Sequence, residues 1–303
     1  METSERIVKR HLERLYELTT EEDFHNQHTP FEICDEMLGK IEGLNSGMEI
    51  LVMFNLEFVY KLKEKFGRGG MENIWFLTPC EAKKEFAKSL GVNENHIRIY
   101  SYKDKRIIEE ESMPKFDVVV GNPPYKGRLH LEFLNLVYGL SKKYIVWIHP
   151  GGWLFNKSGK TSIYDETKNL IDKFVVSIDL FSFRKYFPIR FHAPGVILFI
   201  DKGKNPKNKI IVEDKFKDQR TAEYNSIRDL NVWNETMIVP TIQNKILSYC
   251  GKEDNFSNHI DKEEGDFYIK REIIVGGANE TQDNRFDYDF FAVTVKTPKV
   301  FNE

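Results

Sequence analysis

The sequence predicts an α/β fold, arranged as a doubly wound sheet with helices on both faces. Short apolar runs typical of buried strands alternate with longer amphipathic stretches typical of helices, from about residue 30 to Asp201. The connections between them are short, and glycine or proline interrupts several of them. Strands that alternate with helices in this way form a parallel sheet, and ligands bind at the carboxyl ends of its strands.

The helices are predicted from apolar residues at helical spacing and from signals at the helix ends. Pro30 precedes one helix, and proline is favourable in a first turn. Gly91 follows another, where glycine is a common C-cap. The predicted helices cover residues 3–18, 31–41, 57–66, 81–90, 129–140 and 168–174.

The strands are predicted from unbroken apolar or β-branched runs. Residues 49–54 read EILVMF, and residues 116–120 read FDVVV and are followed by a glycine and two prolines. The remaining predicted strands cover residues 73–77, 96–100, 144–148, 175–181 and 195–200. After Asp201 the chain is rich in lysine and short of core residues. We therefore expect one domain over residues 1–201 and a small irregular C-terminal region over 202–303.

Composition and charge exclude several classes of protein. The chain has 303 residues and a net charge of −3, which argues against a protein coated in basic charge but leaves room for a local basic groove. Its three cysteines, Cys34, Cys80 and Cys250, lack the spacing of a disulfide framework or a zinc site, so we expect no metal. No signal peptide or membrane-spanning run is evident, which predicts a soluble cytoplasmic protein.

The most informative segment is Gly121-Asn122-Pro123-Pro124-Tyr125, directly after a predicted strand. Two prolines stiffen this loop and remove two backbone donors. Asn122 supplies a side-chain acceptor, the Asn122 and Pro123 carbonyls add further acceptors, and Tyr125 supplies an aromatic face. Such a ledge suits a planar ring that carries an amino group, because acceptors that hold the amino hydrogens stabilise the positive charge that develops on nitrogen. The alternative is a proline-capped turn without a function.

The segment from Phe116 to Tyr125 resembles the catalytic motif of the gamma-ordered amino-group DNA methyltransferases of restriction–modification systems. The resemblance extends over residues 25–200, through His28-Thr29-Pro30-Phe31 and the segment IHPGGWL at residues 148–154. It implies a Rossmann-like class I methyltransferase domain that methylates N6 of a flipped-out adenine with S-adenosylmethionine. Asn122, Pro123 and Pro124 would form the catalytic loop and Tyr125 would stack on the base. The implied partners are double-stranded DNA and a restriction endonuclease or specificity subunit, in a bacterial or phage-infected cell.

The same resemblance implies a set of cofactor-binding residues: Thr29, Pro30, Phe54, Asn55, Glu57, Glu81 and Asp104. Glu81 would hold the ribose hydroxyls, or it would only be a favourable charge in the first turn of its helix. Asp104 would lie near the cofactor adenine, or it would be a solvated loop charge.

The sequence departs from the family at the cofactor loop. A glycine-rich loop normally follows the first strand, but residues 52–58 read VMFNLEF without a glycine. Asn55 and Glu57 either replace some of the missing polar contacts or cap the helix that follows.

On the substrate side, Phe191 and Phe187 are candidates for a second aromatic face on the base, with a role in the core as the alternative, and Lys126 is a third candidate. The lysines between residues 202 and 217 would contact phosphates or belong to a solvated loop. His149 and His192 have no matching ligand set and are assigned structural or substrate-side polar roles. Two other functions stay open: a methyltransferase for RNA or a protein glutamine, and a catalytically silent DNA-binding subunit.

Overall fold

The computed structural model describes residues 4–17, 28–103, 106–108, 110–125, 127–155, 162–187, 194–215 and 220–230. The chain divides into one compact unit over Met1–Leu230 and a second over Asn231–Glu303. The described residues all belong to the first unit, so most of the predicted C-terminal region lies outside them.

The helices and strands of this unit follow most of the predicted segments closely. The helices are α1 (Ser4–Glu17), α2 (Phe31–Gly39), α3 (Leu56–Phe66), α4 (Glu81–Leu90), α5 (Leu129–Leu140), α6 (Ile163–Ile171) and α7 (Phe183–Tyr186). The strands are β1 (Ile50–Met53), β2 (Ile74–Thr78), β3 (Ile97–Ser101), β4 (Arg106–Ile107), β5 (Phe116–Gly121), β6 (Ser141–Pro150), β7 (Val175–Phe181), β8 (Gly195–Asp201), β9 (Ile210–Asp214) and β10 (Arg220–Tyr224).

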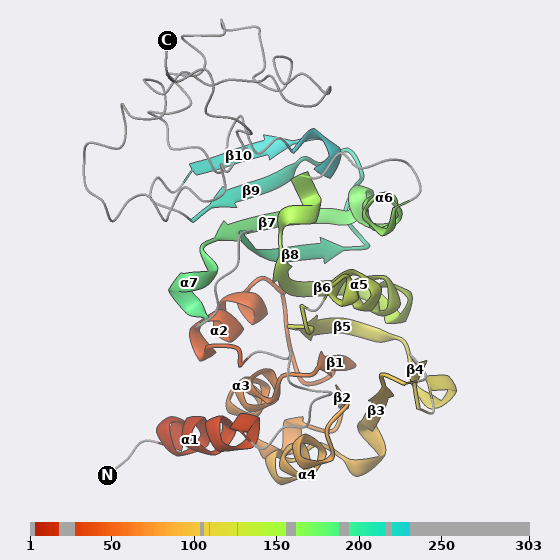
Figure 1. Cartoon of the computed structure of the whole chain (residues 1–303). Coiled ribbons are helices and arrows are strands. Elements are labelled where there is room, and N and C mark those ends of the chain that lie inside the picture. The colour runs from red at the N-terminus through yellow and green to blue at the C-terminus, as the bar shows by residue number, and fades with distance from the viewer. Residues whose placement is uncertain are drawn as a thin grey trace, which may run out of the picture. The chain divides into compact units, whose positions relative to one another are not determined.

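The described strands form a ten-stranded sheet between two helical layers, in the order β10-β9-β7-β8-β6-β5-β1-β2-β3-β4 (Figure 1). Successive residues of β1 face opposite sides: Ile50 and Val52 join the core that also contains α2 and α3, whereas Leu51 and Met53 join the core that contains α5. Helices α2, α3 and α4 pack along the first face, and α5 packs against α6 on the second. The predicted α/β fold with helices on both faces is confirmed.

The strand order reverses between β1 and β5. From β1 the chain builds the sheet outward through β2 and β3, all parallel; β5 then pairs with the other edge of β1, and β6 follows outside β5. In open α/β sheets such a reversal opens a crevice outside the carboxyl ends of the two strands, which is where ligands bind. Met53 and Gly121 are register partners at these two ends.

Strand direction and extent differ from the predicted all-parallel sheet. Strand β8 is antiparallel to both β6 and β7. The sequence did not predict this direction, because an apolar run such as GVILFI contains no information on it. Strands β9 and β10 continue the sheet past Asp201, within the stretch predicted to be short of core residues. Ile210 and Val212 of β9 are buried there, and two buried residues in a lysine-rich background are a weak sequence signal.

Gly121 permits the close approach of three strands, and replacing it with alanine is expected to destabilise the fold. A Cβ atom at this position would lie 2.8 Å from the Met53 Cβ and 3.0 Å from both the Met53 carbonyl oxygen and the Trp147 ring. Overpacking of this kind typically costs about 1–3 kcal/mol in the free energy of unfolding. Urea denaturation measures the loss, with Gly139→Ala as the control, since a Cβ at Gly139 meets no atom within 4 Å. Equal stability of both variants would contradict the close approach.

Candidate functional site

The predicted catalytic loop begins directly after β5, at the point where the strand order reverses. Asn122 follows Gly121, the last residue of β5, and Asn55 lies two residues after Met53, the last residue of β1. A third segment, which precedes α2 and contains Thr29, reaches the same place, because its side chain contacts Asn122. Residues far apart in sequence therefore converge at the sheet edge where α/β proteins bind ligands.

Asn122 is fully buried and is held from several directions. Its backbone N–H donates to Asn55 Oδ1 at 3.2 Å. Its side-chain Nδ2 donates to Thr29 Oγ1 at 3.0 Å. Its Oδ1, the acceptor that the predicted chemistry requires, accepts a short hydrogen bond from the Tyr125 hydroxyl. The amide is thus rigidly placed, with its acceptor end toward Tyr125.

Tyr125 packs edge-on against an aromatic cluster instead of presenting an open face. Its ring is 5.5 Å from that of Phe183 at an interplanar angle of 63°, and only 7% of the residue is exposed. Burial raises the pKa of Tyr125 well above its usual value, and the bond to Asn122 opposes this shift only in part. The hydroxyl therefore stays protonated and can donate to Asn122. Pro123 and Pro124, between these two residues, are also buried.

Three side chains are predicted to contact the substrate, and of these the described part of the chain includes only Phe187. It is 2% exposed and packs against Phe183 at 5.5 Å between ring centroids. Because Phe183 in turn contacts Tyr125, the three rings of Phe187, Phe183 and Tyr125 form one continuous aromatic cluster. Phe191 and Lys126 lie outside the described residues.

The segment before α2 is tied to the start of α3. The Thr29 N–H donates to Glu57 Oε1 at 3.1 Å, and His28 Nε2 lies 3.4 Å from the same oxygen. Thr29 and Glu57 are both fully buried, and Pro30 is half-buried as the N-cap residue of α2. Glu57 is therefore not simply a surface charge on the dipole of α3, because its carboxylate fixes the backbone of Thr29.

The turn between β1 and α3 lacks the free backbone amides that a glycine-rich cofactor loop offers. The turn has only two residues, Phe54 and Asn55. The Phe54 N–H donates to the Leu77 carbonyl at 2.8 Å and the Asn55 N–H donates to the Met53 carbonyl at 2.9 Å, so both amides are already used within the protein. A glycine-rich loop would instead offer free amides and room for close approach.

Phe54 fills the position where a glycine is expected. It has a φ of 69°, a strained value for a residue with a side chain, and its ring is fully buried. The ring packs 4.9 Å from Phe133 and 6.4 Å from Tyr100. The buried Lys83 donates from its Nζ to the Phe54 carbonyl at 3.3 Å. The sequence does not predict this contact, because a lysine within a helical pattern is usually exposed.

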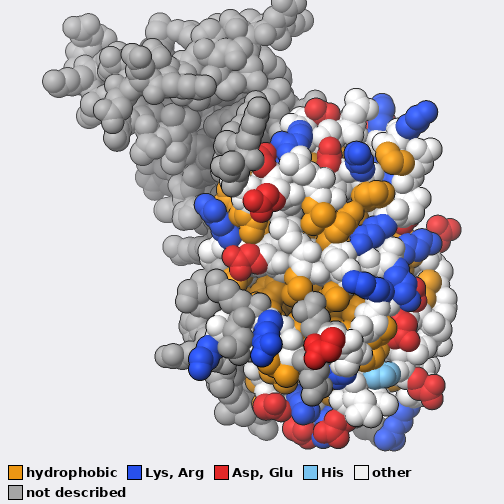
Figure 2. Space-filling view, turned by 90° about the vertical axis from the view of Figure 1, so that its right-hand side faces the viewer, with side chains coloured by type: hydrophobic (Ala, Val, Ile, Leu, Met, Phe, Trp, Pro, Cys, Tyr) orange, Lys and Arg blue, Asp and Glu red, His pale blue; other side chains and the backbone are white. Residues whose placement is uncertain are grey.

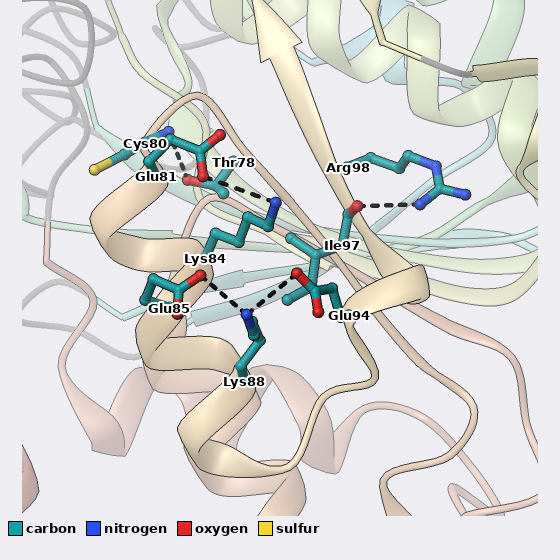
Figure 3. A network of polar contacts seen from close by, with 9 residues as sticks. All are labelled: Thr78, Cys80, Glu81, Lys84, Glu85, Lys88, Glu94, Ile97 and Arg98. Atoms are coloured by element: carbon teal, nitrogen blue, oxygen red, sulfur yellow. Dashed lines mark hydrogen bonds and ion pairs between the residues drawn. The ribbon is translucent and has the colours of Figure 1, made fainter.

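Glu81 presents an exposed carboxylate at the start of α4. It begins α4, after the carboxyl end of β2, and its side chain is 72% exposed, with Lys84 at 3.8 Å (Figure 3). Thr78 and Cys80 form the turn before it, through a bond of 3.1 Å from the Cys80 N–H to the Thr78 hydroxyl (Figure 3). Both interpretations of Glu81 are compatible with this geometry. Asp104 lies outside the described residues.

Several lysines of the predicted phosphate-contacting run bind within the protein. Lys202 donates to the carbonyls of Tyr138 and Ser141 at the end of α5, and Lys204 donates to the Val175 carbonyl. Lys215 pairs with Asp179 and with a glutamate of α2. On the face that carries α5 and α6, basic side chains are interspersed with acidic and uncharged ones (Figure 2). These three lysines therefore stabilise the fold.

His130 and His149 form a buried pair between α5 and β6 that the sequence did not predict. Their rings stack with centroids 5.6 Å apart at an interplanar angle of 23°. His130 is the second residue of α5, and His149 lies near the end of β6. Burial lowers the pKa of His130 to about 3, with a further contribution from His149, and burial lowers the pKa of His149 to about 4. Trp153 donates its indole N–H to His149 Nδ1 at 3.1 Å. Both rings are therefore neutral at pH 7.

Within the described residues, no group of three or more His, Cys, Asp or Glu side chains is arranged to hold a metal ion. Among the helices of the same residues, none combines the length and the apolar character needed to cross a bilayer.

No protein-family model matches the sequence, and no curated protein matches it. Solved structures of similar shape include the methyltransferase subunit of a type I restriction–modification system from Streptococcus thermophilus, with a TM-score of 0.48, 15% identity, and coverage of 76% of this chain and 54% of that one. A modification subunit of a candidate type I restriction enzyme from Vibrio vulnificus has a TM-score of 0.46 and 17% identity, covering 73% and 54%. A candidate class I S-adenosylmethionine-dependent methyltransferase from Listeria monocytogenes has a TM-score of 0.46 and 14% identity, covering 69% and 72%. The chain spans about half the length of the two type I subunits.

Proposed function

We propose that this protein is a DNA methyltransferase that acts on N6 of a flipped-out adenine, with S-adenosylmethionine as the methyl donor. The observation that carries the proposal is the placement of Asn122. A buried amide follows the strand at the switch point, and Thr29 and Asn55 hold it from two distant segments. An amide held this firmly is preorganised to accept hydrogen bonds from an amino group.

The residues of the loop would have separate roles toward the adenine: two would accept hydrogen bonds from its amino group, and one would stack on its ring. The Asn122 Oδ1 and the Pro123 carbonyl would accept its two hydrogens, which favours a tetrahedral nitrogen and frees its lone pair. Tyr125 would have to leave its edge-on contact with Phe183 to stack on the ring, and this stacking would offset part of the cost of flipping, which is a few kcal/mol. In the described structure the Tyr125 hydroxyl occupies Asn122 Oδ1, so the incoming base must displace this hydroxyl.

A second candidate, a catalytically silent DNA-binding subunit, is favoured by the turn between β1 and α3. The amides of Phe54 and Asn55 are already bonded within the protein, and the Phe54 ring lies in the core. Glu81 offers an open carboxylate for a ribose, but the amino-acid end of the cofactor has no comparable place in this turn. On the family resemblance, the partners in either case are duplex DNA and a restriction or specificity subunit, in the cytoplasm.

One experiment separates the two candidates. Calorimetric titration of S-adenosylmethionine into the full chain, with and without unmethylated duplex DNA, measures binding of the cofactor. Incubation with cofactor labelled in its methyl group, followed by nucleoside analysis, measures methyl transfer. Binding together with labelled N6-methyladenine supports the enzyme. DNA binding with neither cofactor binding nor label would refute the enzyme and leave the silent subunit.

A further inference from the structure

We propose that Thr29, Asn55 and Glu57 are positioning residues that orient the Asn122 amide, and that they are not ligands of a cofactor. The inference rests on the proposed function, since it assigns a purpose to the orientation of Asn122. Each of these four side chains is fully buried. A hydrogen bond lost among them is not replaced by water and costs roughly the desolvation of the group left unpaired.

The first contact holds the backbone of the loop. Pro123 and Pro124 have no N–H, so the Asn122 N–H is the only backbone donor in the tripeptide Asn122-Pro123-Pro124. That donor is bonded to Asn55 Oδ1 at 3.2 Å. Asn55 is itself fixed by the bond of its own N–H to the Met53 carbonyl. The short turn after β1 thus anchors the loop after β5, in the place where a cofactor cradle was expected.

The second contact sets the direction of the side chain. Thr29 Oγ1 accepts from Asn122 Nδ2 at 3.0 Å, and the Thr29 backbone is held by Glu57 Oε1 at 3.1 Å. The amide group is planar, with Oδ1 and Nδ2 at its opposite ends. Holding Nδ2 toward Thr29 therefore turns Oδ1 toward Tyr125, where its hydrogen bond from the Tyr125 hydroxyl lies.

The test compares Thr29→Val, which keeps the shape of the side chain but removes the acceptor, with Thr29→Ser, which keeps the hydroxyl. The probes are an adenine-containing single-stranded oligonucleotide and the same oligonucleotide with deoxynebularine, a purine without the amino group, in each adenine position. We expect the wild type and Thr29→Ser to prefer adenine on the order of 2- to 10-fold, the range of one net hydrogen bond. Thr29→Val is expected to lose this preference and to bind S-adenosylmethionine as the wild type does.

A nuclear magnetic resonance measurement makes the inference independent of the proposed function. The side-chain amide resonances of Asn122, identified by their absence in Asn122→Asp, should shift in Thr29→Val and in Asn55→Ala and return in Thr29→Ser and Asn55→Asp. If the shifts occur but the wild type does not prefer adenine, the proposed function fails and the positioning role stands. Unchanged resonances, or weaker cofactor binding with an unchanged preference for adenine, would overturn the positioning role.

Discussion

Replacing Asn122 with alanine is expected to lower the rate of methyl transfer to adenine by about 10²-fold or more. The change removes Oδ1, the acceptor proposed to hold the amino group, and also leaves the Thr29 and Tyr125 hydroxyls without this partner. Because a preorganised acceptor acts mainly on the transition state, the loss should fall on kcat more than on KM. Steady-state kinetics with labelled cofactor and unmethylated duplex DNA measure both constants.

The matched control is Asn73→Ala, which removes another asparagine side chain with a hydrogen bond, from Nδ2 to the Ser46 carbonyl at 2.9 Å. Asn73 precedes β2 and therefore lies at the amino ends of the strands, at the opposite edge of the sheet from the site. It should keep the kinetics of the wild type. Activity of Asn122→Ala close to that of the control would show that the loop is a structural turn.

The second large effect is a loss of stability in acid, caused by the buried pair of His130 and His149. Their pKa values of about 3 and about 4 in the folded protein lie below the value of 6.5 in the unfolded chain. The unfolded state therefore binds protons first as the pH falls, so the stability present above pH 6.5 is lost between pH 6.5 and about 3. From pH 7.5 to pH 5, we expect a loss of about 2 kcal/mol for each ring.

Urea denaturation at pH 7.5 and pH 5 measures this loss. His130→Leu removes one titrating ring while keeping the backbone carbonyl that accepts from Trp147, so it should reduce the difference between the two pH values by about half. Gly139→Ala, which adds a Cβ with no atom within 4 Å and removes no titrating group, is the control and should leave the difference unchanged. A pH dependence that is identical in the wild type and His130→Leu would contradict the origin proposed for it.

Local patterns were sufficient to locate most elements. Helices α4 and α5 begin and end at the predicted residues, because glycine ends the first and apolar spacing defines the second. Strand β5 and the loop after it were predicted from a β-branched run stopped by two prolines. The position of this loop at a sheet edge also followed, since the carboxyl ends of parallel strands meet there. The catalytic and binding roles assigned to these residues remain predictions.

Other features depend on partners that are distant in the chain. The antiparallel direction of β8 follows from its pairing with β6 and β7, and an apolar run does not encode the direction of a strand. The lysines after Asp201 looked like a solvated or phosphate-binding run, yet Lys202 and Lys204 bind backbone carbonyls of earlier segments. Composition cannot distinguish a solvated lysine from one that binds a backbone carbonyl, because the residue type is the same in both.

The sequence by itself determined the α/β architecture, the stiff loop at the end of β5 and the absence of glycine after β1. Only the tertiary structure decided what replaces the glycine loop. Phe54 enters the core, Asn55 holds the Asn122 backbone, and Glu57 holds the segment that contains Thr29. The physical reason is burial: a polar side chain inside the protein must find a partner, and the folded chain supplies that partner from residues dozens of positions away.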